Sequence, residues 1–258
     1  MLTFRNTVAG FSALLAALFL ADAFLPVSPW LYVILVFVLL VFLILGSISI
    51  HAGFYMKSIC SGNRNERSVA LTFDDGPDEI ITPQILDILK EKNIKATFFV
   101  IGKKADKYPD ILKRIHKEGH LIGGHSYSHH FFFDWFTFRQ MEHELKLTAE
   151  IVLRVTGKKI RLFRPPYGVT NPTLGRIVGS LQYASIGWSL KSGDTRIRDA
   201  EQLLRRLKMN LKPGDVVLFH DTNPWTADLM KTFVAYLLQE HYAVEPIDQF
   251  LNVKAYED

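Results

Sequence analysis

The amino-acid sequence predicts an α/β protein built on a parallel sheet and preceded by a hairpin of two membrane-spanning helices. Two observations lead to this prediction. From about residue 68 onward, short apolar runs alternate with helix-length amphipathic segments, which is typical of parallel strands joined by helical crossovers. Residues 8–50, by contrast, contain a single charged residue, Asp22. An apolar stretch of that length indicates passage through a bilayer.

The N-terminal segment divides into two apolar runs, residues 8–25 and 27–50. Each approaches or exceeds the ~20 residues that a helix needs to cross the hydrocarbon core. A short turn with two prolines and a serine separates them, so residues 1–50 are expected to form a transmembrane hairpin. A cleaved signal peptide over residues 1–23 is the alternative, because a basic residue, an apolar run and small residues follow one another there.

The charges that flank the hairpin predict its orientation. Arg5 precedes the first run, Lys57, Arg64 and Arg67 follow the second, and the turn between the runs has neither Lys nor Arg. The positive-inside rule therefore places both flanks, and the domain that follows, on the cytoplasmic side of a bacterial membrane. If the first run only lies at the interface, a single span would export the domain instead.

Residues 51–67 are expected to be a linker, and residues 68–258 a catalytic domain. Strands are expected at residues 69–73, 96–100, 121–124, 160–164, 183–188, 216–219 and 242–245. Helices are expected at residues 82–92, 107–118, 138–155, 172–180, 200–210 and 226–239. About seven parallel strands suggest a closed or nearly closed β/α barrel. A doubly wound open sheet is the alternative fold.

The charge and the cysteine content of the chain argue against two classes of protein, nucleic-acid-binding proteins and proteins stabilised by internal disulfides. The formal net charge of the 258-residue chain is +4, and no basic cluster is dense enough to suggest a nucleic-acid partner. Cys60 is the only cysteine, which excludes an internal disulfide.

Two sequence motifs together predict a metal site. An apolar run ends at Asp74 and Asp75, and adjacent carboxylates repel one another unless a cation lies beside them. His125 and His129 are four residues apart, a spacing that brings both rings to one face of a helical turn or a helix-like loop. One Asp with two His would leave coordination positions open for water and substrate, as in catalytic metal sites. The sequence therefore predicts a metallohydrolase.

The order of four motifs then resembles a known family, the polysaccharide deacetylases (carbohydrate esterase family 4, with the NodB-homology domain). The resemblance covers about residues 67–250, and its motifs are TFDDG at 72–76, HSYSH at 125–129, RPPYG at 164–168 and LFH at 218–220. It implies a distorted (β/α)7 barrel with the motifs at the C-terminal ends of strands. It also implies removal of an N-acyl group, acetyl above all, from an amino sugar.

Chemistry and resemblance agree on roles for the remaining motif residues. With Asp75 and the two histidines holding a metal that activates a water nucleophile, Asp74 is free to act as general base, and Arg164 would keep it ionised. His220 would protonate the leaving nitrogen, and Asp194 would fix the orientation of that imidazole. The resemblance further implies that the Tyr167 N–H stabilises the oxyanion, with Pro166 and Leu218 beside the substrate.

The cofactor prediction is one divalent ion, with zinc first and cobalt, nickel or iron as alternatives. The predicted partners are an amino-sugar glycan or glycolipid and, through the hairpin, the lipid bilayer.

Two features keep alternatives open. The family usually has Asp-Trp in its fourth motif, whereas here Thr195 follows Asp194, and Trp188 is expected in the core. Residues 131–138 form a dense aromatic run, either core or a platform near the site. A lipid-linked sugar or another small acyl conjugate is therefore an alternative substrate. A non-catalytic sugar-binding membrane protein is the alternative from another class.

Overall fold

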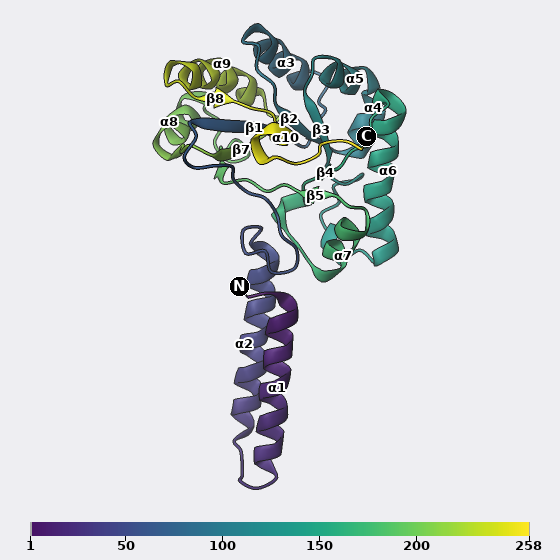
Figure 1. Cartoon of the computed structure of the whole chain (residues 1–258), viewed down its shortest axis with the longest axis vertical. Coiled ribbons are helices and arrows are strands. Elements are labelled where there is room, and N and C mark those ends of the chain that lie inside the picture. The colour runs from purple at the N-terminus through teal and green to yellow at the C-terminus, as the bar shows by residue number, and fades with distance from the viewer. Residues whose placement is uncertain (1, 258) are drawn as a thin grey trace.

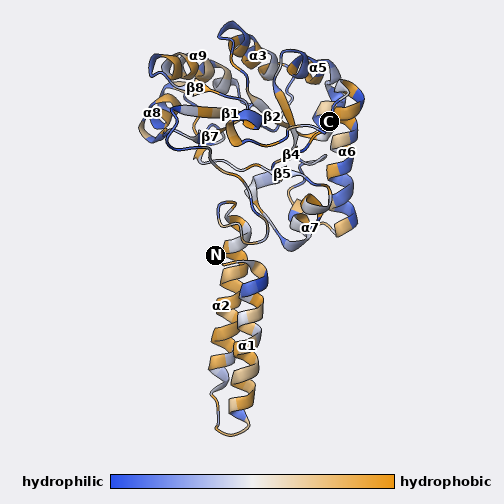
Figure 2. Cartoon of the chain, viewed as in Figure 1, coloured by the Kyte–Doolittle hydropathy of each residue, from blue (hydrophilic) through white to orange (hydrophobic). Residues whose placement is uncertain are grey.

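The computed structural model describes residues 2–257, as a curled α/β unit that stands on a two-helix stalk (Figure 1). The stalk is formed by α1 (Phe4–Asp22) and α2 (Pro29–Ile48). Both helices are long and apolar enough to cross a membrane, and Figure 2 shows apolar residues along most of the stalk. The Asp22 carboxylate accepts a hydrogen bond from the Val27 N–H at 2.8 Å. The one charge of the apolar segment thus closes the turn between the two helices.

The sheet is parallel throughout and runs in the order β5-β4-β3-β2-β1-β7-β6, with β8 paired to the start of β1. Its strands are β1 (Ser68–Asp74), β2 (Thr97–Val100), β3 (Leu121–Gly124), β4 (Leu162–Phe163), β5 (Ala184–Ser185), β6 (Leu190–Lys191), β7 (Asp215–His220) and β8 (Ala243–Val244). Among the described residues, the edge strands β5 and β6 do not pair with each other. The predicted distorted β/α barrel is therefore confirmed, and it is open between these two strands.

Helices pack around the outside of the curled sheet (Figure 1). They are α3 (Ile81–Glu91), α4 (Gly102–Lys107), α5 (Pro109–Lys117), α6 (Phe138–Thr156), α7 (Pro172–Ser180), α8 (Ala200–Asn210), α9 (Pro224–Gln239) and α10 (Ile247–Leu251), with 3₁₀ turns η1 (Phe133–Trp135) and η2 (Pro166–Gly168). The single helix expected at 107–118 is wrong in its first turn. Pro109 lacks the N–H that would continue a helix, so α4 ends before it and α5 begins at it. The short elements α4, β6 and α10 were not expected.

Alternation along the strands separates an outer core from an inner one. In β1, Leu71 and Phe73 belong to the cluster that packs against the helices, whereas Ala70 belongs to the cluster inside the curl. Side chains two residues apart share a face of a strand. The same parity therefore carries Thr72 and Asp74 to the inside, where polar groups can gather at the end of the strand.

The stalk is docked onto the barrel. Two hydrogen bonds join Ser47 of α2 to Thr170. The Thr170 N–H donates to the Ser47 carbonyl at 2.9 Å, and the Ser47 hydroxyl donates to the Thr170 carbonyl at 2.7 Å. Ile50, two residues past α2, is buried in the inner core with Ile186. Within the expected linker, Ile59 pairs with Ile186 through a parallel bridge. The end of α2 is consequently fixed against the barrel wall.

Candidate active site

The two adjacent aspartates point in different directions because the strand ends between them. Asp74 is the last residue of β1 and lies beside His220, its register partner on β7. Asp75 has a φ of 73° and turns out of the strand. A Cβ on the next residue, Gly76, would collide with the Asp221 carboxylate, so only glycine fits there. One carboxylate is therefore buried and the other reaches the opening.

Arg164 holds Asp74 from inside the barrel. Its Nη1 donates to the Asp74 Oδ1 at 2.7 Å and to the Thr72 hydroxyl at 2.8 Å. Its Nε and Nη2 donate to the carbonyls of Ile186 and Gly187, and the guanidinium lies 4.1 Å from the centre of the Phe99 ring. Arg164 is completely buried. The buried guanidinium thus gives the Asp74 carboxylate a charged partner at 2.7 Å.

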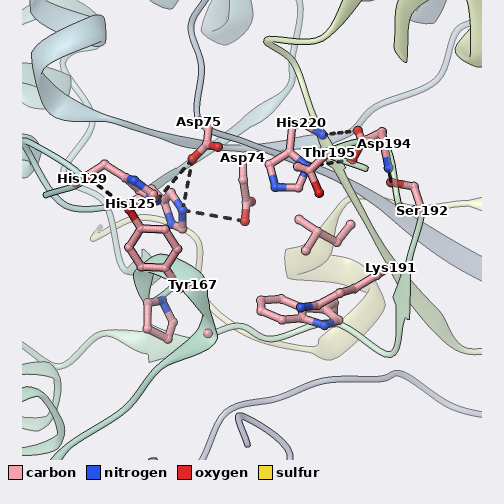
Figure 3. Close-up of a pocket in the computed structure, with 15 residues that line it drawn as sticks. Asp74, Asp75, His125, His129, Tyr167, Lys191, Ser192, Asp194, Thr195 and His220 are labelled. Carbon is pink, nitrogen blue, oxygen red and sulfur yellow. Dashed lines mark hydrogen bonds and ion pairs between the residues drawn. The ribbon is translucent and has the colours of Figure 1, made fainter. Parts of the chain in front are cut away.

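Asp75, His125 and His129 bring three donor atoms together, all within 4.8 Å of one another. Figure 3 shows the two rings converging on the carboxylate. The Asp75 Oδ1 lies 3.5 Å from the His125 Nε2 and 3.4 Å from the His129 Nε2. It is buried and has no hydrogen-bond partner among residues 2–257. An unsatisfied carboxylate oxygen facing two imidazole nitrogens fits a divalent cation such as zinc.

The tautomer of His125 also suits a ligand. Its Nδ1 lies 2.8 Å from the carbonyl oxygen of Arg164. A carbonyl can only accept, so Nδ1 carries the proton and Nε2 presents its lone pair to the cluster. Arg164 thus contributes to the site twice, through its side chain and through its backbone.

The segment from His125 to His129 is a loop, not a helical turn. Ser126 and His129 both have positive φ, 61° and 49°. The Glu144 carboxylate of α6 accepts the N–H groups of Tyr127 and Ser128 at 2.9 and 2.7 Å. The His125 and His129 rings therefore converge because of the conformation of this loop, which Glu144 of the neighbouring helix α6 stabilises.

The surroundings of Asp75 and His129 shift the pKa values of both groups downward. Burial raises the pKa of Asp75, but the nearby cationic forms of His125, His129, His220 and Lys104 outweigh it, so the net shift is downward. Burial, with His125 beside it, lowers the pKa of His129 to about 4. At neutral pH the carboxylate is therefore ionised and this imidazole neutral, the states that bind a metal.

His220 faces the cluster from β7 and is paired with Asp194 (Figure 3). Its Nδ1 lies 2.8 Å from the Asp194 Oδ1, and its backbone N–H donates to Oδ2 at 2.7 Å. Asp194 is almost completely buried and also accepts the Thr226 hydroxyl. Burial lowers the pKa of His220, but the hydrogen bond and charge of Asp194 raise it to about 9. The ring is therefore a proton donor at neutral pH.

These groups border one cavity of about 360 Å³. Asp74, Asp75, His125, His129, Tyr167, Asp194, Leu218 and His220, all singled out from the sequence, line it. Pro166 does not line it, and the adjacent Pro165 does. Arg164 lies behind the wall and acts through Asp74.

Sequence reasoning missed part of the cavity wall. Trp188 is only 7% exposed, as expected for a core residue, yet it also lines the cavity. Lys191 lies beside it, with its Nζ 4.6 Å from the centre of the Trp188 ring. Lys191 lies on β6, which was not predicted, and Trp188 lies just before that strand. The only signal of this pair in the sequence was an aromatic residue three positions before a lysine.

The aromatic run at 131–138 is divided between core and surface. Phe133 is completely buried, whereas Phe131, Phe132 and Trp135 are 73%, 56% and 86% exposed. The Phe131 ring lies 6.2 Å from that of Tyr167, which lines the cavity. The exposed part of the run therefore adjoins the mouth of the site.

Comparisons with known proteins agree with this geometry. A polysaccharide deacetylase family model matches residues 61–186. A peptidoglycan-N-acetylglucosamine deacetylase of Bacillus cereus is 40% identical over 164 residues, which are 63% of this chain and 58% of the relative. The peptidoglycan-N-acetylmuramic acid deacetylase PdaA of Bacillus subtilis is 32% identical over 197 residues, covering 75% of this chain and 74% of the relative. The chain thus spans less than two thirds of the Bacillus cereus relative.

A solved structure extends the likeness to the fold. The crystal structure of a peptidoglycan N-acetylglucosamine deacetylase, in complex with a naphthalenyl N-oxidanyl-benzamide, superposes with a TM-score of 0.73 at 32% identity. The match covers 77% of this chain and 94% of that one. With the curled parallel sheet and the four motifs at its strand ends, these matches show that the chain belongs to the polysaccharide deacetylase family.

Proposed function

We propose that the chain is a divalent-metal-dependent hydrolase that removes an N-acyl group, most simply acetyl, from an amino sugar in a glycan or glycoconjugate. The observation that supports it best is the shared cavity. A three-donor cluster, a separately held carboxylate and a protonated imidazole all face the same space. Amide hydrolysis requires these three functions. In this proposal residues 1–50 are the membrane hairpin, 51–67 the connection and 68–258 the catalytic domain.

Asp75, His125 and His129 would hold the ion. When bound there, a divalent cation lowers the pKa of water and polarises a carbonyl. Asp74 takes the proton of the attacking water, because Arg164 holds its carboxylate in place and the residue lines the cavity. The backbone N–H of Tyr167, whose ring lies beside His129, stabilises the oxyanion that forms.

His220 completes the reaction by giving its proton to the departing amine. Its Nδ1 is engaged with Asp194, so the proton on Nε2 is the one available to the cavity. The C–N bond of the amide breaks, the acyl carbon keeps the oxygen of water, and the sugar keeps a free amine.

The substrate class rests on the relatives, whose names specify N-acetylglucosamine and N-acetylmuramic acid of peptidoglycan. If the chain were instead a non-catalytic sugar-binding protein, it would have kept the complete set of metal-binding and proton-transfer residues without using them. The tests below address it, because a binding protein would release no acetate.

The first prediction concerns the metal ligands. His125→Ala and His129→Ala should each remove most of the bound ion and lower activity by more than about a hundredfold, since even groups that only orient ligands cost up to that much. Metal content by mass spectrometry and acetate release from chitooligosaccharides measure both effects. His130→Ala, an exposed neighbour in the same loop, is the control. Stoichiometric metal in a folded double variant of His125 and His129 would refute the assignment.

The second prediction separates the two aspartates. Asp74→Asn should keep the metal and lose about 10²–10⁴-fold in turnover, because an amide cannot accept the proton of water. It also leaves Arg164 without its counter-charge, so a melting curve must accompany the kinetics. If Asp74→Asn empties the site while Asp75→Asn retains the ion, the roles of the two carboxylates are exchanged.

The third prediction concerns pH. A general acid must be protonated, so activity should fall as the pH rises through the pKa of His220, about 9. Asp194→Asn removes the partner that raises this pKa and leaves the burial that lowers it. The alkaline limb of kcat/KM should therefore move to lower pH. Asp199→Asn, at the exposed cap of α8, is the control, and an unmoved limb in Asp194→Asn would contradict the role of this pair.

The fourth prediction concerns the side of the membrane. From the positive residues at both ends of the hairpin, we expect the catalytic domain on the cytoplasmic side. A fluorescent protein fused after residue 258 should then be bright, and alkaline phosphatase at the same position should be inactive. High phosphatase activity would place the domain outside, next to wall peptidoglycan.

A further inference from the structure

The active-site cavity adjoins a second hollow that the stalk helps to form. This groove has a volume of about 710 Å³, and its walls come from the last turns of α2 and the segment just after it. Trp188 and Lys191 line both spaces. In Figure 3 the Lys191 side chain stands on one border of the catalytic cavity. The catalytic cavity and the groove are thus neighbours across a single pair of residues.

The groove lies at the level of the membrane surface if the stalk spans the bilayer. Helix α2 has 20 residues, which at 1.5 Å per residue is about 30 Å, the thickness of the hydrocarbon core. The groove is lined by Phe42, Leu45 and Ile48 from the last turns of this helix. Ile50 is already buried in the barrel. No spacer separates bilayer and barrel, so the groove opens where lipid chains meet the headgroup layer.

The residues that line the groove change from apolar on the stalk to basic next to the catalytic cavity. Leu45 and Ile48, on the stalk, are 55% and 61% exposed, so an apolar chain can lie against them. His51 follows them, and Lys191 forms the border with the catalytic cavity. Within the described part of the chain, no carboxylate forms an ion pair with Lys191. Its ammonium group is therefore available to an anionic ligand.

We infer that the substrate is membrane-borne: an acetamido sugar joined through a phosphate or diphosphate to a long apolar chain. This inference rests on the proposed deacylase function and names its substrate. The sugar occupies the catalytic cavity, the phosphate lies against Lys191, and the first part of the chain follows the groove along α2 into the bilayer. Water replaces the amine at the acyl carbon, acetate leaves, and the sugar–phosphate bond stays intact.

A free polysaccharide fits this side of the site less well. A polysaccharide that continued past Trp188 and Lys191 would meet the end of α2 and the polypeptide segment that follows this helix. An apolar tail, by contrast, can lie against the exposed Leu45 and Ile48 side chains of the groove and continue into the bilayer. The docked stalk therefore blocks a polymer and accommodates a lipid at the same place.

The test compares two substrates with the same head group. Full-length, metal-loaded protein in nanodiscs of anionic phospholipid is given N-acetylglucosamine diphosphate carrying either a polyprenyl chain or a methyl group, and acetate release is measured. The polyprenyl substrate should have a kcat/KM at least tenfold higher. Leu45→Trp, which fills the groove, should reduce that ratio at least tenfold. Ile44→Trp is the matched control, because Ile44 is 59% exposed on the same helix but does not line the groove.

The outcomes separate this inference from the proposed function. Acetate from the methyl substrate and from chitotetraose, with no preference for the polyprenyl chain, would overturn the lipid-linked substrate and leave the deacylase standing. An equal loss of preference in Leu45→Trp and Ile44→Trp would overturn the groove as the chain site. No acetate from any of the three substrates would overturn the proposed function itself.

Discussion

The buried ion pair between Arg164 and Asp74 is the interaction on which the rest of the site depends. Arg164 is completely buried, and its donors reach Asp74 and Thr72 on β1 as well as two carbonyls just after the neighbouring strand β5. Breaking such a pair costs about 3–5 kcal/mol, because one charge is left without a partner in a medium of low polarity. The same residue fixes the His125 tautomer through its carbonyl. Fold stability and the placement of the catalytic groups are therefore coupled at one side chain.

The two carboxylates of one dipeptide differ in surroundings because the backbone changes conformation between them. Asp74 keeps strand geometry and lies beside His220, whereas Asp75 adopts a positive φ and turns toward the histidines. Each then has its own neighbour, the Arg164 guanidinium for the first and the imidazole nitrogens of His125 and His129 for the second. The mutual repulsion expected of adjacent aspartates is relieved by separation as well as by counter-charge.

The two-helix stalk and the site belong to one structure. The stalk ends in two hydrogen bonds to Thr170 and in Ile50, which is buried in the inner core. The barrel is open between β5 and β6, and the segment joining these strands carries Trp188. A barrel closed at this point would separate stalk and cavity. The gap in the sheet thus brings the apolar helices and the catalytic groups to a common wall.

The sequence by itself determined the α/β class, the stalk and nearly every chemical group, since strand parity and motif order depend on local periodicity. Asp74, Arg164 and His220 follow apolar runs, so their positions at strand ends were predictable. The sequence did not predict the two-residue strand β6 or the loop conformation of residues 125–129. It also did not predict that Trp188 and Lys191 lie at the border of the cavity. Short strands lack a periodic pattern, and Glu144, which braces the loop, is distant in sequence. The groove required the docking of α2 on the barrel, a contact between segments more than 100 residues apart that only the tertiary structure decides.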